Sequence, residues 1–363
     1  MTKTTFILGA GFSCEAGAPS QEKIVEKIFE IYNTVPHEFE ENSFHNFREF
    51  LSNTLNIPES LQTQVPLEDL FTPIDRAILD NISFRDLSTR ELKKIRRTIY
   101  YLISKTLQVT LKTSNKKYID KFAEYIVSQC SPRANRAYRG HDRVSILSTN
   151  WDILLDNSIK RILDKDHQEP KGVVDYCCYI SSYKEDDDTI KPGLEILGSG
   201  GFNVKLLKLH GSLNWLQCPR CQRLYVDFYR KISIDHYSNC RHCDKNFGKK
   251  RSHSLTSNLI MPTFLKDLSN PQYKLIWQNA GIELSESNNI IFIGYSLPSA
   301  DFEMRQLLSR MIRDDAKITV VDYGDESLEN IKNMKLRYET FFGNRQIEFY
   351  LKGTKSFIEN EYP

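Results

Sequence analysis

Short apolar runs alternate with amphipathic segments along much of the chain. The apolar runs contain β-branched and aromatic residues, a composition typical of buried strands. They occupy 5–8, 143–149, 204–209, 289–294 and 317–322, with a last edge strand expected at 346–351. Helical patterns separate the later runs, at 273–280 and after residue 301. This order of strand, helix and strand predicts an α/β fold with a doubly wound parallel sheet.

A long helical block interrupts this order after the first strand. Apolar residues recur at three- and four-residue steps between about 20 and 130, which predicts helices over 24–32, 44–55, 67–79 and 92–111. The block is too long for one crossover helix, so we expect a helical subdomain inserted at 21–139. The main domain would then combine 1–20, 140–215 and 255–363. Residues 165–203 are expected to form a loop or a small excursion.

The first strand runs directly into a turn of small residues. Gly9, Ala10 and Gly11 follow it, and the small-residue stretch ends at Pro19. A strand, a glycine turn and a helix form the first unit of a dinucleotide-binding fold, where backbone N–H groups and the helix N-terminus favour a pyrophosphate. The strict G-x-G-x-x-G spacing fails because Cys14 takes the third glycine position. An ordinary tight turn is the alternative.

Polar side chains follow several of the predicted strands. Asn150 and Asp152 follow the second strand, His210 follows the third, and Asp322 closes the strand at 317–322. The carboxyl ends of strands in open α/β sheets face the ligand crevice, so these residues are candidate ligand contacts. Imidazole exchanges protons near neutral pH, as a general base must. The alternatives are a helix cap at Asp152, turn residues at Asn150 and Asp322, and a structural histidine.

Four cysteines form the most specific motif of the sequence. Their spacing, C-x₂-C-x₁₈-C-x₂-C, is typical of a closed tetrahedral zinc site, whose ligands would be Cys218, Cys221, Cys240 and Cys243. A redox dithiol pair is the rival interpretation. A closed set of thiolates leaves no open coordination position, so we expect structural zinc in a small ribbon at 216–254.

Composition narrows the class of protein only slightly. The 363 residues are 40% hydrophobic and 26% charged, as in ordinary globular proteins, and the net charge of +2 does not by itself imply nucleic-acid binding. There is no apolar run of about 18 residues and no signal-peptide pattern, so no membrane association and a cytoplasmic location are expected.

Short motifs occur in an order that matches a known family. They are 9–13 (GAGFS), 16–19 (AGAP), 149–152 (TNWD), 209–212 (LHGS), the four cysteines, 294–296 (GYS) and 321–322 (VD). In this order they resemble the sirtuin family, and more closely its prokaryotic sirtuin-like branch. The resemblance leaves the helical block at 20–130 uncovered.

The resemblance implies a Rossmann-like domain that binds NAD in its crevice and breaks the bond between nicotinamide and ribose. Asn150 and Asp152 would lie beside the nicotinamide and its ribose, and His210 would be the catalytic histidine. The remaining cofactor contacts would be Gly9, Ala10, Gly11 and Ser13 at the pyrophosphate, Ser296 and Asp322 at the adenosine half, and Gly294.

One departure from the family bears on the reaction. Deacetylating sirtuins continue from the proline of the turn into an acid, an aromatic residue and an arginine, whereas this chain has Ser20, Gln21 and Glu22. We therefore expect an NAD glycohydrolase that yields nicotinamide and ADP-ribose, of the kind that depletes NAD in bacterial antiphage defence. The alternatives are an NAD-dependent protein deacylase or ADP-ribosyltransferase, which the retained cysteines favour, and a non-catalytic nucleotide-binding scaffold.

The resemblance to the prokaryotic sirtuin-like branch implies that this protein acts with further partners. Proteins of this branch are often homo-oligomers that a partner activates, such as a translocase-type ATPase, an Argonaute-like protein or a phage protein. Nucleic acid would then take part only indirectly.

Overall fold

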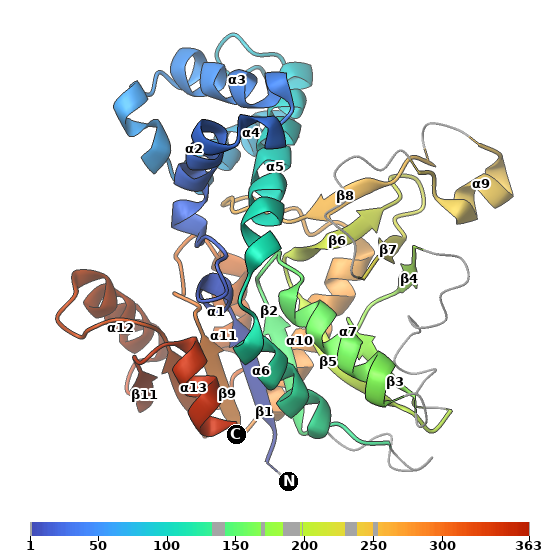
Figure 1. Cartoon of the computed structure of the whole chain (residues 1–363), viewed down its shortest axis with the longest axis vertical. Helices are drawn as coiled ribbons and strands as arrows, with labels where there is room; N and C mark the ends of the chain where they lie inside the picture. The colour runs from blue at the N-terminus through green and yellow to red at the C-terminus, as the bar shows by residue number, and fades with distance from the viewer. Residues whose placement is uncertain are drawn as a thin grey trace.

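A seven-stranded parallel sheet forms the centre of the protein (Figure 1). The structure is a computed structural model that describes residues 2–132, 142–167, 171–183, 197, 199–228, 238–249 and 253–362. The strand order is β11-β10-β9-β1-β2-β5-β3. The strands are β1 Thr4–Leu8, β2 Val144–Ser148, β3 Gly172–Asp175, β5 Phe202–Lys208, β9 Asn289–Ile293, β10 Lys317–Val321 and β11 Ile347–Tyr350.

Helices cover both faces of this sheet, which explains why its strands are continuous apolar runs rather than alternating ones. Every residue of β2 is buried. One face carries α6 Lys117–Ser128, α7 Leu154–Asp166 and α13 Thr354–Glu361, and the other carries α10 Pro271–Glu286, α11 Phe302–Met311 and α12 Glu329–Phe342 (Figure 1). The predicted doubly wound parallel sheet is therefore confirmed.

The order of the strands defines where a ligand would bind. The chain passes from β1 to β2 on one side of β1 and later returns to β9 on its other side. The connections after β1 and β9 thus diverge to opposite sides. A crevice opens at such a switch point, outside the carboxyl ends of the strands.

The loop predicted for 165–203 is wrong in part. Gly172–Asp175 forms strand β3 and pairs in parallel with β5. Only two residues of β3, Val173 and Val174, are buried apolar ones, which is too short a run to be evident in the sequence. Gly172 also lies so close to Leu163 and Phe202 that an added Cβ would meet them at 2.6 and 2.7 Å.

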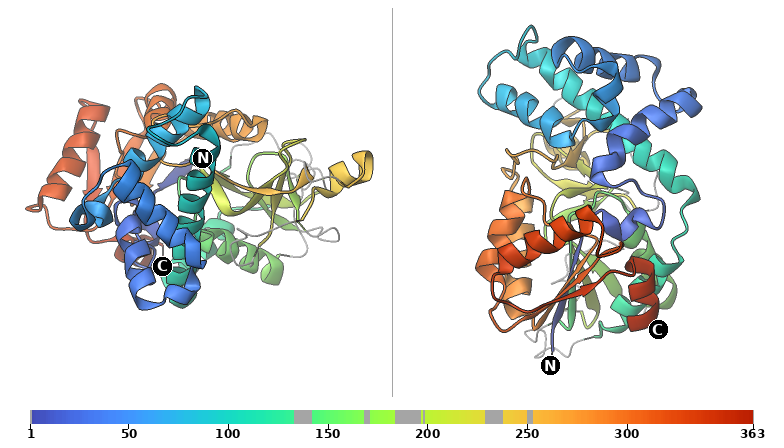
Figure 2. Two further views of the ribbon diagram at one scale, coloured as in Figure 1. Left: turned by 90° about the horizontal axis from the view of Figure 1, so that it is seen from above. Right: turned by 90° about the vertical axis from the view of Figure 1, so that its left-hand side faces the viewer.

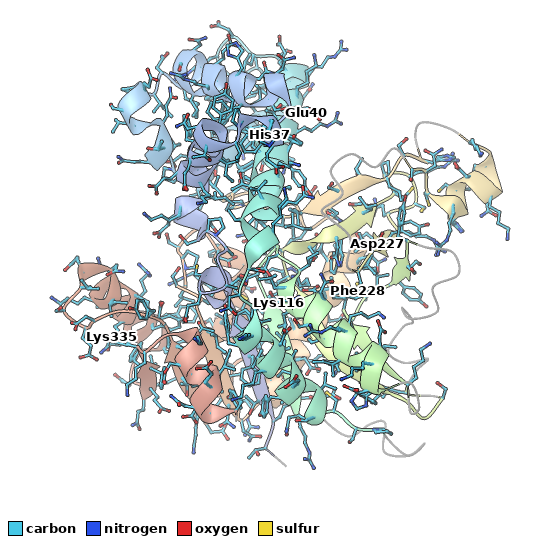
Figure 3. The ribbon with its side chains drawn as sticks, viewed as in Figure 1. His37, Glu40, Lys116, Asp227, Phe228 and Lys335 are labelled. Carbon is cyan, nitrogen blue, oxygen red and sulfur yellow. The ribbon has the colours of Figure 1, made fainter. Side chains whose placement is uncertain are left out.

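The helical block forms a subdomain with its own hydrophobic core. It stands above the carboxyl edge of the sheet (Figures 1 and 2). Its helices are α2 Ile24–Thr34, α3 Glu41–Glu49 with a π-helical extension Phe50–Thr54, α4 Leu67–Leu79 and α5 Thr89–Thr110. A capping box between Ser88 and Glu91 begins α5. In Figure 3, His37 and Glu40 mark this subdomain and Lys335 marks α12.

Helix α6 lies within the range expected for the insertion, 21–139, but packs elsewhere. Its buried residues, among them Phe122 and Ile126, belong to the core around the sheet. Phe122 meets Phe6 of β1 edge to face, with ring centroids 5.1 Å apart. Our division of the chain into domains at these residue numbers stays a prediction.

A smaller sheet lies beside the main one and carries the cysteines. Its order is β4-β7-β6-β8, and β6 is antiparallel to β7 and β8. Its strands are β4 Ile180–Ser182, β6 Gly211–Gln217, β7 Leu224–Val226 and β8 Thr256–Leu259. Asp227 and Phe228 follow β7 (Figure 3). Strand β6 begins one residue after His210 and ends one residue before Cys218, so it joins the sheet edge to the cysteines.

Among the described residues, no helix combines the length and apolar character that crossing a membrane requires.

Candidate functional site

A cavity of about 890 Å³ opens at the carboxyl edge of the main sheet, and Pro66 and Leu67 of the helical subdomain form part of its wall. Its size is within the usual range for small-molecule sites. The turns after β1, β2, β5, β9 and β10 all contribute to its wall, as expected at a switch point. Of the predicted site residues, it is lined by Ala10, Gly11, Asn150, Asp152, His210, Gly294, Ser296 and Asp322. Gly9 and Ser13 lie in the adjoining turn.

Three glycines allow the turns after β1 and β9 to touch. A Cβ on Gly9 would lie 2.4 Å from the carbonyl oxygen of Gly294, and one on Gly294 would lie 2.3 Å from the carbonyl carbon of Gly11. Gly294 also has a φ of +59°, which side chains other than glycine rarely adopt. The N–H of Gly11 donates to Gly294 O at 2.9 Å. Close packing of two backbones therefore requires these glycines, apart from any ligand.

Asn150 presents a buried polar atom without a partner. The residue is 8% exposed and lines the cavity. Its Oδ1 accepts no hydrogen bond from the residues that the structure describes. Leaving a buried acceptor unsatisfied costs about 1–3 kcal/mol. The side chain is thus placed for a donor or a developing positive charge that a ligand would supply.

Asp152 is already engaged by the protein. Ser13 Oγ donates to its Oδ2 at 2.8 Å, and the N–H of Leu154 donates to its Oδ1 at 3.1 Å, at the start of α7. Its carbonyl oxygen accepts a hydrogen bond from the buried Lys208 at 2.6 Å. Leu154 is the first residue of α7, so this contact agrees with the helix cap named in the sequence analysis as the alternative role of Asp152. Ser13 and Asp152 together tie the turn after β1 to the turn after β2.

His210 lies beside a buried carboxylate that sequence reasoning missed. Its Nε2 is 3.3 Å from Asp301 Oδ1. Lys266 Nζ lies 3.0 Å from the same oxygen, and Tyr295 Oη donates to Asp301 Oδ2 at 2.8 Å. Burial alone would raise the pKa of Asp301, but His210 and Lys266 outweigh it and hold that pKa well below its usual range. Asp301 is therefore a carboxylate fixed on both oxygens at the cavity wall.

Two other groups at the cavity have shifted pKa values. Burial, with smaller contributions from Asp152, Asp322 and Glu15, raises the pKa of the Cys14 thiol to about 11. A thiol with that pKa is protonated at neutral pH, which argues against Cys14 as a nucleophile. Burial also raises the pKa of Asp322, against the opposing effect of the N–H of Tyr323.

The helical subdomain closes one side of the cavity. Gln21 Nε2 donates to Glu68 Oε1 at 2.6 Å, which links the end of the first turn to the start of α4. Pro66 and Leu67 line the same side. The sequence around Pro66, Leu67 and Glu68 contains no motif that predicts a place in the site. Asp301 offered a signal, an acid at the end of a polar turn after a strand, whereas Lys266 offered none.

The four cysteines converge as the spacing predicts. Their Sγ atoms all lie within 4.8 Å of one another, with Cys218 and Cys243 at 3.8 Å and Cys221 and Cys240 at 3.7 Å. Zinc–sulfur bonds of about 2.3 Å in a tetrahedron require sulfur–sulfur distances of about 3.8 Å. The residues fit a structural zinc ion, and their closed arrangement leaves no position for a substrate. Tyr225 Oη lies 3.1 Å from Cys240 Sγ and adds a polar contact to the cluster.

Of the comparisons with known proteins, only the comparison with solved structures found similar proteins. No protein-family model and no curated protein matches the chain. A Sir2 homologue in complex with NAD is similar over 99% of this chain and 88% of its own, at 12% identity and a TM-score of 0.45. A mutant of a Sir2 homologue with ADP-ribose is similar over 99% and 90%, at 12% identity and a TM-score of 0.44. With such low identity, functional assignment depends on this chain's own site.

Proposed function

We propose that the protein is an NAD glycohydrolase that cleaves the nicotinamide–ribose bond. One observation carries the proposal: the unpartnered Oδ1 of Asn150 lines the same switch-point cavity as His210. A polar atom that is buried without a partner is prepared for charge that develops on a bound substrate. The motif resemblance names NAD as that substrate.

The proposed reaction breaks one bond and forms one. The electron pair of the bond between ribose C1′ and the pyridinium nitrogen leaves with nicotinamide, which becomes neutral. The ribose then carries oxocarbenium character. Asn150 Oδ1 either stabilises this positive charge directly or orients the water that attacks C1′. Water adds to C1′ and gives up a proton to His210, which passes it to solvent. The products are nicotinamide, ADP-ribose and a proton.

We assign the remainder of NAD to other residues of the cavity and to the turn beside it. We assign the pyrophosphate to the turn of Gly9, Ala10, Gly11 and Ser13, and the adenosine half to Gly294, Ser296 and Asp322. In this assignment Asp152 lies near the nicotinamide ribose, where Ser13 and Leu154 hold it. Asp322, an acid that follows a later strand, is suited to accept hydrogen bonds from the ribose hydroxyls of the adenosine half.

Residues at the cavity wall are the reason that we propose hydrolysis ahead of deacylation. Ser20, Gln21 and Glu22 line the cavity where a deacetylase places its acid, aromatic residue and arginine. Gln21 is bound to Glu68 of the helical subdomain, and Lys266 is held by Asp301 and Glu303. A sirtuin-type deacylase or ADP-ribosyltransferase is the second candidate, because the deacetylating branch carries the same four cysteines.

We further propose a cellular role in antiphage defence, in which activation of the enzyme depletes cytoplasmic NAD. The motif resemblance supports this role. On the same ground the protein would be a homo-oligomer activated by a translocase-type ATPase, an Argonaute-like protein or a phage component.

The test is an incubation of the full chain with NAD, with and without an acyl-lysine peptide, followed by chromatography of the products. We expect nicotinamide and ADP-ribose in both reactions, and NAD loss slowed at least about 1,000-fold with His210→Ala. NAD loss only with the peptide would support the deacylase instead. Tight binding without turnover, even with candidate activating partners present, would support the scaffold, and wild-type rates in His210→Ala would overturn the site assignment.

A further inference from the structure

We propose that Asp301 is the positioning residue for His210: it holds the imidazole through Nε2 and leaves Nδ1 as the nitrogen that accepts a proton. The proposal builds on the proposed function, since His210 is the base of that reaction. Asp301 and His210 come from distant parts of the chain and meet at the cavity wall, 3.3 Å apart.

The surroundings of Asp301 fix its carboxylate in one orientation. Tyr295 Oη binds Oδ2, which turns Oδ1 toward both His210 and Lys266. Lys266 is itself held at the cavity wall, because its Nζ donates to Ala300 O at 3.0 Å. Few rotamers satisfy all these contacts at once, so the position of Oδ1 is set before any substrate binds.

The contact between His210 and Asp301 is close without yet being a hydrogen bond. Among the described residues, His210 Nε2 and Asp301 Oδ1 form no hydrogen bond of normal geometry. Contacts of this kind are often long or poorly aligned without substrate and tighten in the reactive complex. Trp277 lies beside the imidazole, with ring centroids 6.4 Å apart.

A carboxylate in this place does two things for a histidine base. A hydrogen bond from Nε2–H selects one of the two neutral tautomers and so decides which nitrogen is basic. Its negative charge also stabilises the imidazolium that forms when the base takes its proton. Lys266 is shared between Asp301 and Glu303, so the approach of His210 adds a second partner to Asp301 Oδ1.

The chain offers a matched control two residues away. Glu303 contacts the same Lys266 but is not paired with His210. We expect Asp301→Asn to lower kcat for NAD hydrolysis about 100-fold with KM within about threefold, and Glu303→Gln to change either by less than about twofold. The variant His210→Ala/Asp301→Asn should be no slower than His210→Ala, because residues that act as a unit are not additive.

A second readout does not depend on activity. In ¹⁵N-histidine-labelled full-length protein, with His210 assigned by its absence in His210→Gln, the neutral ring should carry its proton on Nε2. Asp301→Asn should abolish that preference and Glu303→Gln should keep it. An unchanged tautomer in Asp301→Asn, or kcat losses that add in the double variant, would overturn the proposal. Wild-type activity in His210→Ala would overturn the proposed function instead, and the tautomer would still decide the role of Asp301.

Discussion

The cavity and the cysteine cluster are both largely buried, but they are assembled differently and prepared for different ligands. The cavity collects residues from most of the chain, between Ala10 and Thr354, whereas the cysteines all lie within 218–243. The four thiols converge on one point within 4.8 Å, so a single ion completes them. At the cavity, Asn150 Oδ1 is buried and unsatisfied among the described residues. The cluster is arranged for a permanent ligand that contributes to folding, and the cavity for a transient one that is released.

This difference predicts that activity and stability separate between the two regions, and Asn150→Ala should show the largest effect. We expect NAD hydrolysis to fall about 100- to 1,000-fold, as when one stabilising polar group is lost from an active site. Stability should hardly change, because Oδ1 forms no hydrogen bond that the substitution removes. Product chromatography and thermal unfolding together measure both quantities. A large drop in the unfolding temperature would make Asn150 a structural residue.

Cys218→Ser should do the reverse. We expect loss of bound zinc and a lower unfolding temperature by at least about 5 °C, since binding of structural zinc is part of the folding free energy. Elemental analysis and a thermal melt check this, with Cys178→Ser as the control because Cys178 lies outside the cluster. A metal-free wild type that melts at the normal temperature would contradict the zinc site.

Gly294→Ala separates close packing from backbone strain. We expect a loss of about 2–4 kcal/mol in the free energy of unfolding, from the left-handed backbone and from overlap with Gly11. Gly343→Ala is the matched control, because Gly343 has a φ of +62° but an added Cβ would meet nothing within 4 Å. It should lose only about 1–2 kcal/mol. Equal losses in chemical denaturation would show that the contact between the turns contributes nothing.

Glu68→Gln should give the smallest effect, on the helical side of the cavity. Burial raises the pKa of Glu68, so the folded state favours the protonated acid. Protonated Glu68 therefore contributes to stability at pH values below the pKa that it has in the unfolded chain. This contribution is lost as pH rises through the pKa that it has in the folded protein. The neutral variant should melt about 1 °C higher at pH 7 and equal to wild type near about pH 4. The exposed Glu26→Gln serves as the control, and the same shift at both pH values would exclude the titration of Glu68.

The sequence predicted those features that depend on local pattern. Apolar runs identified β1, β2, β5, β9 and β10, because strands buried on both faces are continuous in hydrophobicity. The cysteine spacing identified the metal centre for a similar reason, since two residues between thiols are what the knuckle geometry needs. Polar residues after strands led to Asn150 and His210, which do line one cavity.

What the sequence could not predict depends on distant contacts. Asp301 and Lys266 become important only because folding brings both to His210. Strand β3 has too few apolar residues to be evident alone and depends on pairing with β5. Gly294 is predicted as a cofactor contact, and its neighbours show in addition a packing reason that no periodicity contains.

The most direct test of the account is the mass balance of the reaction. The full chain is incubated with NAD in the absence of any acyl-lysine or protein acceptor until the substrate is consumed. We predict one nicotinamide and one ADP-ribose for each NAD lost, with the mass of the protein unchanged. Nicotinamide without matching ADP-ribose, with ADP-ribose attached to protein, would contradict it and establish a transferase.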